Sequence, residues 1–440
     1  LTVDEEGFAV AMEEQKQKAR EGQNFSQKLT TAAGVFDGLD DKITSEFVGY
    51  DALTAEGKVV GLASETELVN TLNEGETGTL ITDVTPFYAT MGGQKGDFGV
   101  ISTENGTFEV TETVKIAGGR IGHMGKVVSG TVTVGDKAEL AVDTDNRKSV
   151  CKNHSATHLL QKALQIVLGD HVEQQGSYQD GARTRFDFSH GQAMTAEEIA
   201  KVEALVNEKI AEDIAVVTDI MSIEDAKKSG AMALFGEKYG KVVRLVKMGD
   251  VSAELCGGTH MSNTAKAGLF KIIGESSVAA GVRRIEAVTG TNVIDYIYHD
   301  KAIIDETAKA LKAGGAADLA AKAVQAENEI KALKNKVDEQ NSMIAGMKTA
   351  NLADSAEKVG AFELITARLD GMTADELRAA GDIIKDKNEN AVALFASELD
   401  GKVILYATCG KAAVKNGANA GKIVKAAAMI CGGGGGGRPD

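Results

Sequence analysis

The sequence predicts a multidomain α+β protein, and three observations support this prediction. Short runs of alternating apolar and polar residues, separated by turns that contain glycine, occupy about residues 57–142. Helix-like and strand-like segments are mixed from 150 to about 290, and a long helical segment with a regular apolar repeat follows. A length of 440 residues allows roughly three or four domains of ordinary size.

The first two predicted units are a helical linker and a small β-domain. Residues 1–56 have mostly helical patterning, and the amphipathic opening without a starting Met suggests a linker from the preceding part of a longer protein. Residues 57–145 are expected to form a small antiparallel β-barrel or sandwich. Strand-like runs such as TLITDV, TFEVTETVKI and KVVSGTVTV alternate in polarity and are bounded by Gly, Asn-Gly or Gly-Asp turns.

Residues 146–295 are predicted to form an α+β core. HSATHLLQKALQIVLG is expected to be a helix that ends at Gly169. A second amphipathic helix begins after Thr195, a plausible N-cap with Glu198 three residues further on. The strand-like segments of this core are 182–189, 242–248, 267–273 and 282–288.

Residues 296–355 are predicted to be a long helical segment with an apolar seam. Spacings of four and three residues relate Leu319, Ala323, Ala326, Ile330, Leu333, Val337, Ile344 and Met347, with Gln340 as the one polar interruption. This heptad pattern of about four repeats favours a helical hairpin or a coiled coil, and so a possible homodimer. The alternative is a single helix packed on its neighbour within the chain.

Residues 356–440 are predicted to form a small α/β domain. Strands are expected at 361–369, 391–398 and 402–409, and helices at 373–387 and 419–430. The chain ends in CGGGGGGRPD. Six glycines are costly to order, so they suit a place where bare backbone N–H groups approach a phosphate. A flexible tail is the alternative.

The charge distribution bears on nucleic acid as a partner. A net charge of −16 argues weakly against it. Between 401 and 440, however, six basic residues stand against Asp440 alone, which gives this segment a net charge of +5. These residues can supply phosphate contacts locally, or they can form a solvated lysine surface.

Cysteine spacing and hydropathy bear on the compartment. The four cysteines, at 151, 256, 409 and 431, are too far apart to indicate a disulfide framework, which favours a reducing cytoplasm. The sequence has no apolar run of about 18 residues and no signal-peptide pattern at its start, so no membrane span is expected.

Two pentapeptides carry the strongest chemical signal. His154 and His158 stand four apart in HSATH, so on a helix both imidazoles lie on one face. Cys256 and His260 flank two glycines in CGGTH, which permit a tight turn. Nitrogen and sulfur donors of this mix select zinc over magnesium or calcium. We therefore predict a site for Zn²⁺ on these four residues.

The sequence leaves open whether such a zinc ion is structural or catalytic. Four protein ligands close a tetrahedral site, whereas catalysis needs an open position, which His260 could provide by binding at longer range or by leaving. Because no HExxH motif is present, no carboxylate base is indicated beside the ligands. Zinc alone could activate the attacking water.

Several longer segments resemble the editing domain of alanyl-tRNA synthetases and of their freestanding AlaX relatives. These segments are HSATHLLQKAL, GDHVEQQGS, RFDFSH, ELCGGTH and GVRRIEAVTG. TPFYATMGGQKGD resembles the barrel segment that precedes that domain, and CGGGGGGRPD resembles the glycine-rich end of the tRNA-binding C-terminal domain. The resemblance covers essentially the whole chain.

The resemblance implies zinc-dependent hydrolysis of Ser-tRNA(Ala) and Gly-tRNA(Ala), with tRNA(Ala) binding and dimerisation through the C-terminal part. It places His154, His158, Cys256 and His260 on the zinc ligands. Gln174 falls on a position that recognises the mischarged amino acid, and Gln94 falls on the glycine-rich motif near the editing pocket. Further candidates for positioning the tRNA end or bracing the site are Arg185, Asp187, Arg283 and Arg284.

Alternatives to these roles remain. Gln174 can be a surface amide, and Arg185 and Asp187 can form structural ion pairs. Thr90-Met91 stands where the family commonly has an acidic residue and Ser before GGQ, which puts any role for that acid in doubt. No class II adenylation core is recognisable, so this chain is not expected to activate alanine. The rival functions are a freestanding AlaX-type deacylase and a non-catalytic tRNA-binding and dimerisation module with structural zinc.

Overall fold

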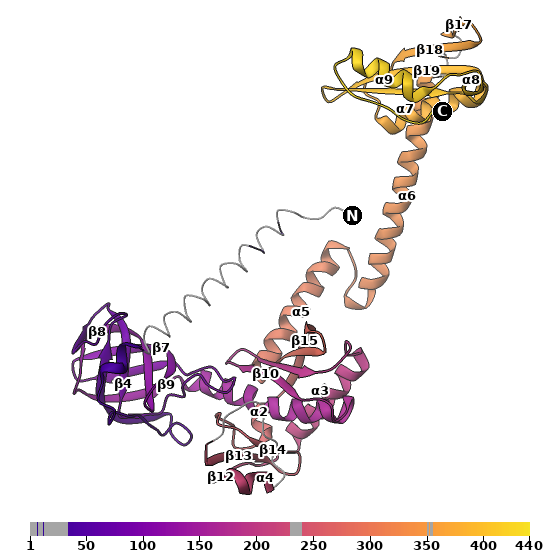
Figure 1. The fold of residues 1–440 in the computed structure, drawn as a ribbon. Coiled ribbons are helices and arrows are strands. Elements are labelled where there is room, and N and C mark those ends of the chain that lie inside the picture. Colours follow the sequence, from indigo (N-terminus) through magenta and orange to yellow (C-terminus); the bar gives the residue numbers. More distant parts are fainter. Residues whose placement is uncertain (1–6, 8–11, 13–33, 229–239, 350–351, 353–354) are drawn as a thin grey trace. The chain divides into compact units, whose positions relative to one another are not determined.

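The computed structural model describes residues 7, 12, 34–228, 240–349, 352 and 355–440 (Figure 1). Contacts divide the chain into two units, Leu1–Asp300 and Lys301–Asp440. No helix in the described part of the chain is long and apolar enough to cross a membrane.

A closed antiparallel barrel forms the first part of unit one (Figure 1). Around it the strand order is β8-β4-β2-β9-β6-β7, and pairing between β7 and β8 closes the ring. Buried Val59, Leu80 and Phe108 are part of its core. The predicted barrel is therefore confirmed over the sandwich. The bounds are β2 (Thr54–Ala63), β4 (Thr77–Thr82), β6 (Gly99–Thr103), β7 (Gly106–Ile116), β8 (Arg120–Thr133) and β9 (Lys137–Val142), with the short β3 (Thr71–Asn73) paired to β8.

The helical prediction for residues 1–56 is wrong where the structure describes the end of that range. After the short 3₁₀ helix η1 (Phe36–Gly38), strand β1 (Glu46–Phe47) pairs in parallel with β5 (Val84–Thr85), and β2 begins at Thr54. The buried Arg120 of the barrel donates to the carbonyls of Asp40 and Ile43, both at 3.0 Å. Tertiary contacts therefore override the local helical pattern here. Most of residues 1–33 lies outside the described residues.

Helix α2 (Thr144–Leu168) leads from the barrel into the α+β core. It ends at Gly169 as predicted, with Gly169 at φ 114°. It begins ten residues before the predicted start, where the Asp143 side chain accepts from Asn146 N–H. Its buried face carries polar residues such as Arg147 and Asn153 as well as apolar ones, so the apolar pattern did not reveal its first turns.

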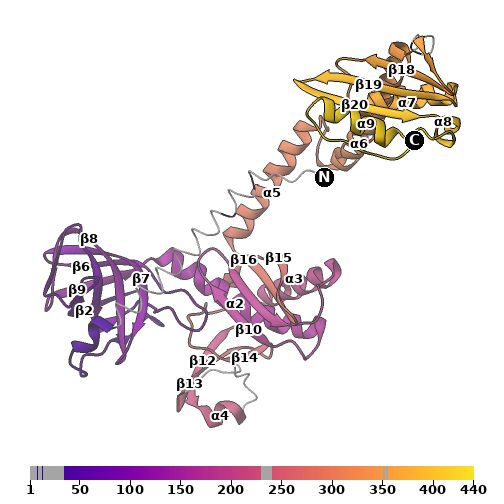
Figure 2. The ribbon, with the colours of Figure 1, turned by 45° about the horizontal axis from the view of Figure 1, so that its top comes forward.

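A four-stranded antiparallel sheet, ordered β10-β11-β16-β15, packs against α2 and α3 (Figure 2). Helix α3 has the predicted capping box between Thr195 and Glu198. The bounds are β10 (Gln174–Gln179), β11 (Thr184–Ser189), α3 (Ala196–Ala211), β15 (Phe270–Ala279) and β16 (Val282–Thr289).

A smaller antiparallel sheet, β12-β13-β14, completes this core. Strand β14 (Ser252–Leu255) runs directly into Cys256 and so fixes the start of the CGGTH loop. The other bounds are β12 (Val216–Ser222), α4 (Ile223–Lys228), β13 (Val242–Met248) and the 3₁₀ helix η2 (Thr264–Ala267).

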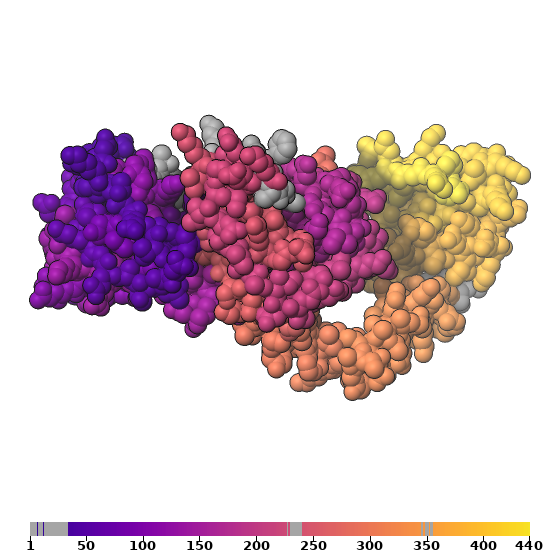
Figure 3. Space-filling view, turned by 90° about the horizontal axis from the view of Figure 1, so that it is seen from below, coloured from indigo at the N-terminus to yellow at the C-terminus, as the bar shows by residue number. Residues whose placement is uncertain are grey.

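The predicted long helical segment is two helices, α5 (Thr291–Ala310) and α6 (Ala316–Thr349). They are separated by Lys312 at φ 53° and by Gly314 and Gly315. Much of α6, in orange, is exposed in the space-filling view (Figure 3). The seam residues Ile330 and Leu333 are 55% and 54% exposed, so packing within this chain does not cover them.

The C-terminal α/β domain has the predicted elements around a sheet ordered β17-β18-β19-β20. Ala391, Ala393 and Phe395 of β19 share one core cluster with buried residues of α7, and Val392 shares another with residues of α8 and α9. The helices therefore cover both faces of the sheet. The bounds are β17 (Glu357–Val359), β18 (Phe362–Arg368), α7 (Ala374–Lys387), β19 (Ala391–Leu399), β20 (Lys402–Cys409), α8 (Lys411–Lys415) and α9 (Ala420–Ile430).

The end of the glycine-rich tail docks on the first turn of α9. Ala420 N–H donates to Pro439 O at 2.8 Å, and Gly421 N–H donates to Arg438 O at 3.0 Å. A Cβ on Gly421 would lie 2.3 Å from Gly437 O, so glycine is needed for this close approach. These two helix N–H groups are thus bonded to the protein's own tail.

Candidate metal centre

The structure brings together the four predicted metal ligands. Helix α2 presents His154 and His158, whose rings lie nearly parallel, and the loop after β14 presents Cys256 and His260. One potential ligand atom from each residue lies within 4.8 Å of the others. Cys256 Sγ lies 3.4 Å from His154 Nε2 and 3.3 Å from His260 Nε2. Bonds of about 2.0–2.3 Å to a tetrahedral zinc would separate ligand atoms by about 3.4–3.6 Å. We call these four residues the ligand cluster.

Each imidazole of the ligand cluster has a partner for its Nδ1 atom. His154 Nδ1 lies 2.8 Å from Gln94 Oε1, and His158 Nδ1 lies 2.7 Å from Glu254 Oε2. His260 Nδ1 lies 3.1 Å from Ser155 Oγ. Metal-binding histidines are commonly held in this way, since a bond at one ring nitrogen fixes the other as the ligand atom. The arrangement therefore directs Nε2 of all three histidines to the centre.

The orientation of Gln94 is fixed by a backbone donor. Thr259 N–H donates to the same Gln94 atom as His154 Nδ1, at 2.8 Å, so that atom is the acceptor Oε1. His154 Nδ1 must then carry a hydrogen. In the neutral ring Nε2 keeps its lone pair, which is the form that binds a metal.

A buried nitrogen without a partner supports the fit of a metal. His158 Nε2 is inaccessible to solvent and has no hydrogen-bond partner among the described residues. Such an atom costs free energy unless something binds it. Three imidazole nitrogens and one thiol sulfur are a donor set that suits zinc. The residues present therefore fit a zinc ion.

Charge within the ligand cluster favours a thiolate. Burial by itself raises the pKa of the Cys256 thiol, but the nearby imidazoles of His154 and His260 outweigh it and hold this pKa well below its usual range. Burial lowers the pKa of His260 to about 3. Burial also lowers the pKa of His158, but the Glu254 carboxylate outweighs this and raises it well above its usual value. A thiolate and neutral imidazoles are the forms that ligate metals, so the directions at Cys256 and His260 favour binding, whereas His158 has to give up a proton when a metal binds.

Residues that the sequence reasoning missed hold the CGGTH loop. The guanidinium of Arg244 donates to Gly258 O at 2.6 Å and lies 3.7 Å from the centre of the Tyr50 ring. Tyr50 O–H in turn donates to Gly257 O at 2.7 Å. A Cβ on Gly258 would lie 2.1 Å from His154 Cε1, so this position requires glycine.

A pocket of about 480 Å³ adjoins the ligand cluster. We call it the Tyr50 pocket. Since Thr259 and His260 line it, a molecule bound there would contact a cluster residue. Its lining consists of Gly49, Tyr50, Asp51, Ala52, Leu53, Arg147, Lys148, Cys151, Lys152, Thr259, His260, Met261, Ser262 and Lys266.

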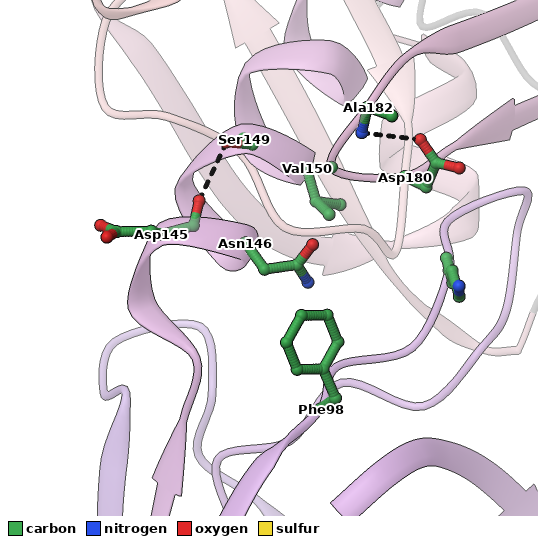
Figure 4. A pocket seen from close by; sticks show the side chains of 9 residues that line it. Phe98, Asp145, Asn146, Ser149, Val150, Asp180 and Ala182 are labelled. Carbon is green, nitrogen blue, oxygen red and sulfur yellow. Dashed lines mark hydrogen bonds between the residues drawn. The ribbon is translucent and has the colours of Figure 1, made fainter.

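A second pocket of similar size lies near the first turns of α2 (Figure 4). Phe98 and Asn146 face one another across it, and Asp145 and Asp180 lie at its sides (Figure 4). None of the four cluster residues lines this pocket. This pocket is therefore a weaker candidate for the binding site of a substrate that reacts at the ligand cluster.

Comparison with known proteins decides the family. The chain is 46% identical to Alanine--tRNA ligase 1 of Lachnoclostridium phytofermentans and 45% identical to Alanine--tRNA ligase of Neisseria meningitidis serogroup C. Both alignments cover 440 residues, which is 100% of this chain and 50% and 49% of the two relatives. The chain belongs to the alanyl-tRNA synthetase family. It spans about half the length of the curated relatives it matches.

Three family models match separate parts of this alanyl-tRNA synthetase relative. Residues 1–146 match tRNA synthetases class II (A), 243–286 match the threonyl and alanyl tRNA synthetase second additional domain, and 362–440 match the DHHA1 domain. The second match includes Cys256 and His260, and folding brings His154 and His158 to them. The barrel lies in the described part of the first match, residues 1–146. That this chain does not activate alanine stays a prediction.

Of the other residues that the family resemblance suggested, Gln94 is joined directly to the ligand cluster, while Gln174 has a different partner. Gln94 is fully buried, and besides its two acceptor contacts its Nε2 donates to Thr259 Oγ1 at 2.8 Å. Gln174 Nε2 donates to Ser177 Oγ at 3.4 Å on the same strand. Gln174 thus remains a candidate without an observed contact to the metal ligands.

The arginine and aspartate candidates form ion pairs on the sheet. Asp187 accepts two hydrogen bonds from Arg284, at 2.6 and 2.8 Å, and lies 3.7 Å from Arg185 Nε. Arg283 makes two bonds of 2.6 Å to Glu275. This geometry favours a structural role for Asp187, Arg283 and Arg284, because their charged groups already have partners.

Proposed function

We propose that the ligand cluster is the centre of a zinc-dependent aminoacyl-tRNA deacylase that clears serine and glycine from tRNA(Ala). One observation carries this proposal. Four buried or half-buried donors converge beside a pocket, with three imidazoles held at Nδ1 and the buried His158 Nε2 lacking a partner. The need for such an activity follows from chemistry. A pocket for alanine cannot strongly reject glycine, which is smaller, or serine, which adds one hydroxyl.

The residues of the chain would hold the metal and the substrate. When bound, zinc supplies Lewis acidity toward a carbonyl oxygen or a water molecule. Gln94, Glu254 and Ser155 hold the three imidazoles in place. Thr259 Oγ1 accepts from Gln94 and from the Cys151 thiol, so its own hydrogen is the group it can offer to a substrate oxygen. The ester to an RNA ribose is activated, so a modest catalyst suffices.

The C-terminal unit is proposed to bind the tRNA body. Its last forty residues carry a net charge of +5 on a chain of −16, which suits contacts to phosphates. The α6 seam is proposed to join two copies of the chain.

The test is deacylation of seryl-tRNA(Ala) by the full chain loaded with zinc. We expect Cys256→Ala to lower the rate by about 100-fold or more, because it removes a metal ligand and leaves three imidazoles without a thiolate. Thr66→Ala, at an exposed residue between β2 and β3 and outside both the ligand cluster and the C-terminal unit, is the control and should leave the rate unchanged. A rate that is unaltered after combining Cys256→Ala with Gln174→Ala would reject the proposal.

A structural zinc site in a non-catalytic tRNA-binding module is the second candidate. The convergence of four ligands favours it, since four protein ligands can close a tetrahedral site. The two candidate functions predict different behaviour of the wild-type chain. If the second is right, the purified chain holds one zinc and binds tRNA, but hydrolyses seryl-tRNA(Ala) no faster than the buffer does.

A further inference from the structure

We propose that Tyr50 and Arg244 are positioning residues for the ligand cluster, and that together they hold the backbone of residues 256–258 in its metal-binding conformation. We call these two side chains the carbonyl clamp. This inference rests on the proposed function and deepens it, because it names residues outside the two pentapeptides on which metal binding depends.

The carbonyl clamp binds three successive carbonyl groups of the CGGTH loop. Arg244 Nη1 donates to Cys256 O at 3.3 Å and to Gly258 O at 2.6 Å. The hydroxyl of Tyr50 donates to the intervening Gly257 O at 2.7 Å. The two side chains also contact each other, because the guanidinium of Arg244 lies 3.7 Å from the centre of the Tyr50 ring. They therefore restrain one short stretch of backbone jointly.

These carbonyls belong to peptide units whose N–H groups serve the ligand cluster. A trans peptide unit is planar, so its C=O and N–H groups point in opposite directions. Gly257 O shares a unit with the N–H of Gly258, which donates to Cys256 Sγ at 3.5 Å. Gly258 O shares a unit with the N–H of Thr259, which donates to Gln94 Oε1 at 2.8 Å. Rotation of either unit would therefore break a bond to the cluster or its outer partner together with a bond to the clamp.

Tyr50 is itself fixed to the helix that carries the other two ligands. In the first turn of α2, Arg147 donates to Gly49 O at 2.6 Å, one residue before Tyr50. A Cβ on Gly49 would lie 2.0 Å from Pro86 O, so glycine is needed for this close approach. Phe47 packs edge-on against the Tyr50 ring at 4.9 Å. Tyr50 therefore links the position of the CGGTH loop to that of α2.

Arg244 is anchored on the sheet that leads into the loop. It lies half-buried on β13, and its own carbonyl accepts from Cys256 N–H at 3.0 Å. Its Nη2 donates to Thr218 Oγ1 of the neighbouring strand β12 at 3.4 Å. The planar guanidinium is thereby held with one edge toward the loop, a geometry that a lysine ammonium cannot reproduce.

The experiment measures binding of Co²⁺, a coloured substitute for zinc, to the full metal-free chain in the absence of RNA. We expect Arg244→Met to lower the affinity about 10–100-fold, the usual effect of losing an outer partner of a metal site. Tyr50→Phe removes one hydrogen bond and keeps the ring, so it should lower the affinity about fivefold. Arg244→Lys should recover part of the loss, because an ammonium can still bond one of the carbonyls.

The absorption spectrum separates positioning from a general loss of stability. Tetrahedral Co²⁺ absorbs strongly in its ligand-field bands, and replacement of a protein ligand by water weakens these bands. At saturating Co²⁺ we expect weaker bands in Arg244→Met than in the wild type, because His260 follows the released carbonyls and loses its position. A variant that only destabilises the fold would show the wild-type spectrum once it is saturated.

Two control variants match the clamp variants. Lys247→Met also removes a cation from β13, but Lys247 bonds Asp219 of β12 at 2.9 Å. Tyr298→Phe removes a hydroxyl from a tyrosine of α5 that is 67% exposed. Both should bind Co²⁺ like the wild type and give its spectrum.

Unchanged affinity in Tyr50→Phe or in Arg244→Met would overturn the inference. So would a lowered affinity of Arg244→Met with an unchanged spectrum at saturation. Because Tyr50→Phe leaves the ring and its packing in place, its affinity decides the case if Arg244→Met does not fold.

Failure of the carbonyl clamp is distinguishable from failure of the proposed function, because metal binding is measured without tRNA. Metal binding that depends on the clamp, in a wild-type chain that does not hydrolyse seryl-tRNA(Ala), would sink the proposed function alone. Deacylation by the wild type, together with a metal affinity that neither clamp variant changes, would sink the clamp alone.

Discussion

At the residue scale, Gln94 connects the barrel domain to the ligand cluster. Its Oε1 accepts from His154 Nδ1 and Thr259 N–H, and its Nε2 donates to Thr259 Oγ1, all at 2.8 Å. Gln94 is completely buried, so none of these bonds can be replaced by water. We therefore predict that Gln94 acts through His154 as a positioning residue.

Replacing Gln94 by Leu should lower zinc affinity by about 10–100-fold, the usual range for loss of an outer partner of a metal-binding histidine. Gln94→Glu should retain most of the affinity, because a carboxylate still accepts from His154, as Glu254 does from His158. The measurement is competition for zinc with a chromophoric chelator. Gln175→Ala, at an exposed neighbour of Gln174, is the control. Unchanged affinity in Gln94→Leu would contradict the positioning role.

The residues of the candidate metal centre were predictable to different degrees. Each pentapeptide encodes its ligand pair locally, through a helical spacing of four or through two glycines, and the structure brings the two pairs together. The outer partners have no such signal. Glu254 lies 96 positions from His158 in the sequence, and Tyr50 lies 207 positions from Gly257, so only folding reveals these bonds.

At the element scale, alternation and capping signals were sufficient for most of the fold. Each predicted barrel strand overlaps an observed one. The predicted N-cap Thr195 precedes α3, and the predicted terminus Gly169 follows the last residue of α2. Prediction failed where tertiary hydrogen bonds decide the conformation. Arg120 donates to the backbone before β2, where a helix was predicted and none forms. In the first turn of α2, the buried Arg147 donates to Asp97 and to Gly49 O.

The barrel contains a buried neutral histidine that should make its stability depend on pH. His123 on β8 is fully buried between Thr85 Oγ1 at 2.8 Å and Leu80 O at 2.9 Å. Burial lowers the pKa of His123 to about 4. In the unfolded chain this histidine takes up a proton near pH 6.5. The contribution of neutral His123 to the free energy of unfolding is therefore fully present above pH 6.5 and is lost as the pH falls toward 4.

Between pH 7 and pH 5 the wild type should therefore lose about 2 kcal/mol more stability than His123→Gln. Urea unfolding followed by circular dichroism at the two pH values measures this difference. His299→Gln, at an exposed residue of α5, should behave like the wild type. If His123→Gln loses as much stability as the wild type over this interval, the buried histidine is not the cause.

At the scale of the whole molecule, the apolar seam of α6 is exposed and is expected to bind a partner helix. Ile330, Leu333 and Val337 repeat at spacings of three and four and are 55%, 54% and 52% exposed. Apolar side chains in a continuous heptad stripe gain free energy when a second helix covers them. Because the repeat would be the same in each copy, a second copy of this chain supplies a matching stripe.

We therefore expect the chain to be a dimer in solution, and Leu333→Lys combined with Val337→Lys to convert it to a monomer, because four charges would otherwise be buried in the paired seam. Light scattering coupled to size-exclusion chromatography measures the mass directly. Val324→Lys is a closely matched control, since Val324 is equally exposed at 57% but lies beside the seam, next to Ala323. That variant should stay dimeric. A wild type that is monomeric at micromolar concentration, or a dimer that survives the two seam lysines, would show that α6 does not pair two chains and that its apolar stripe serves another contact.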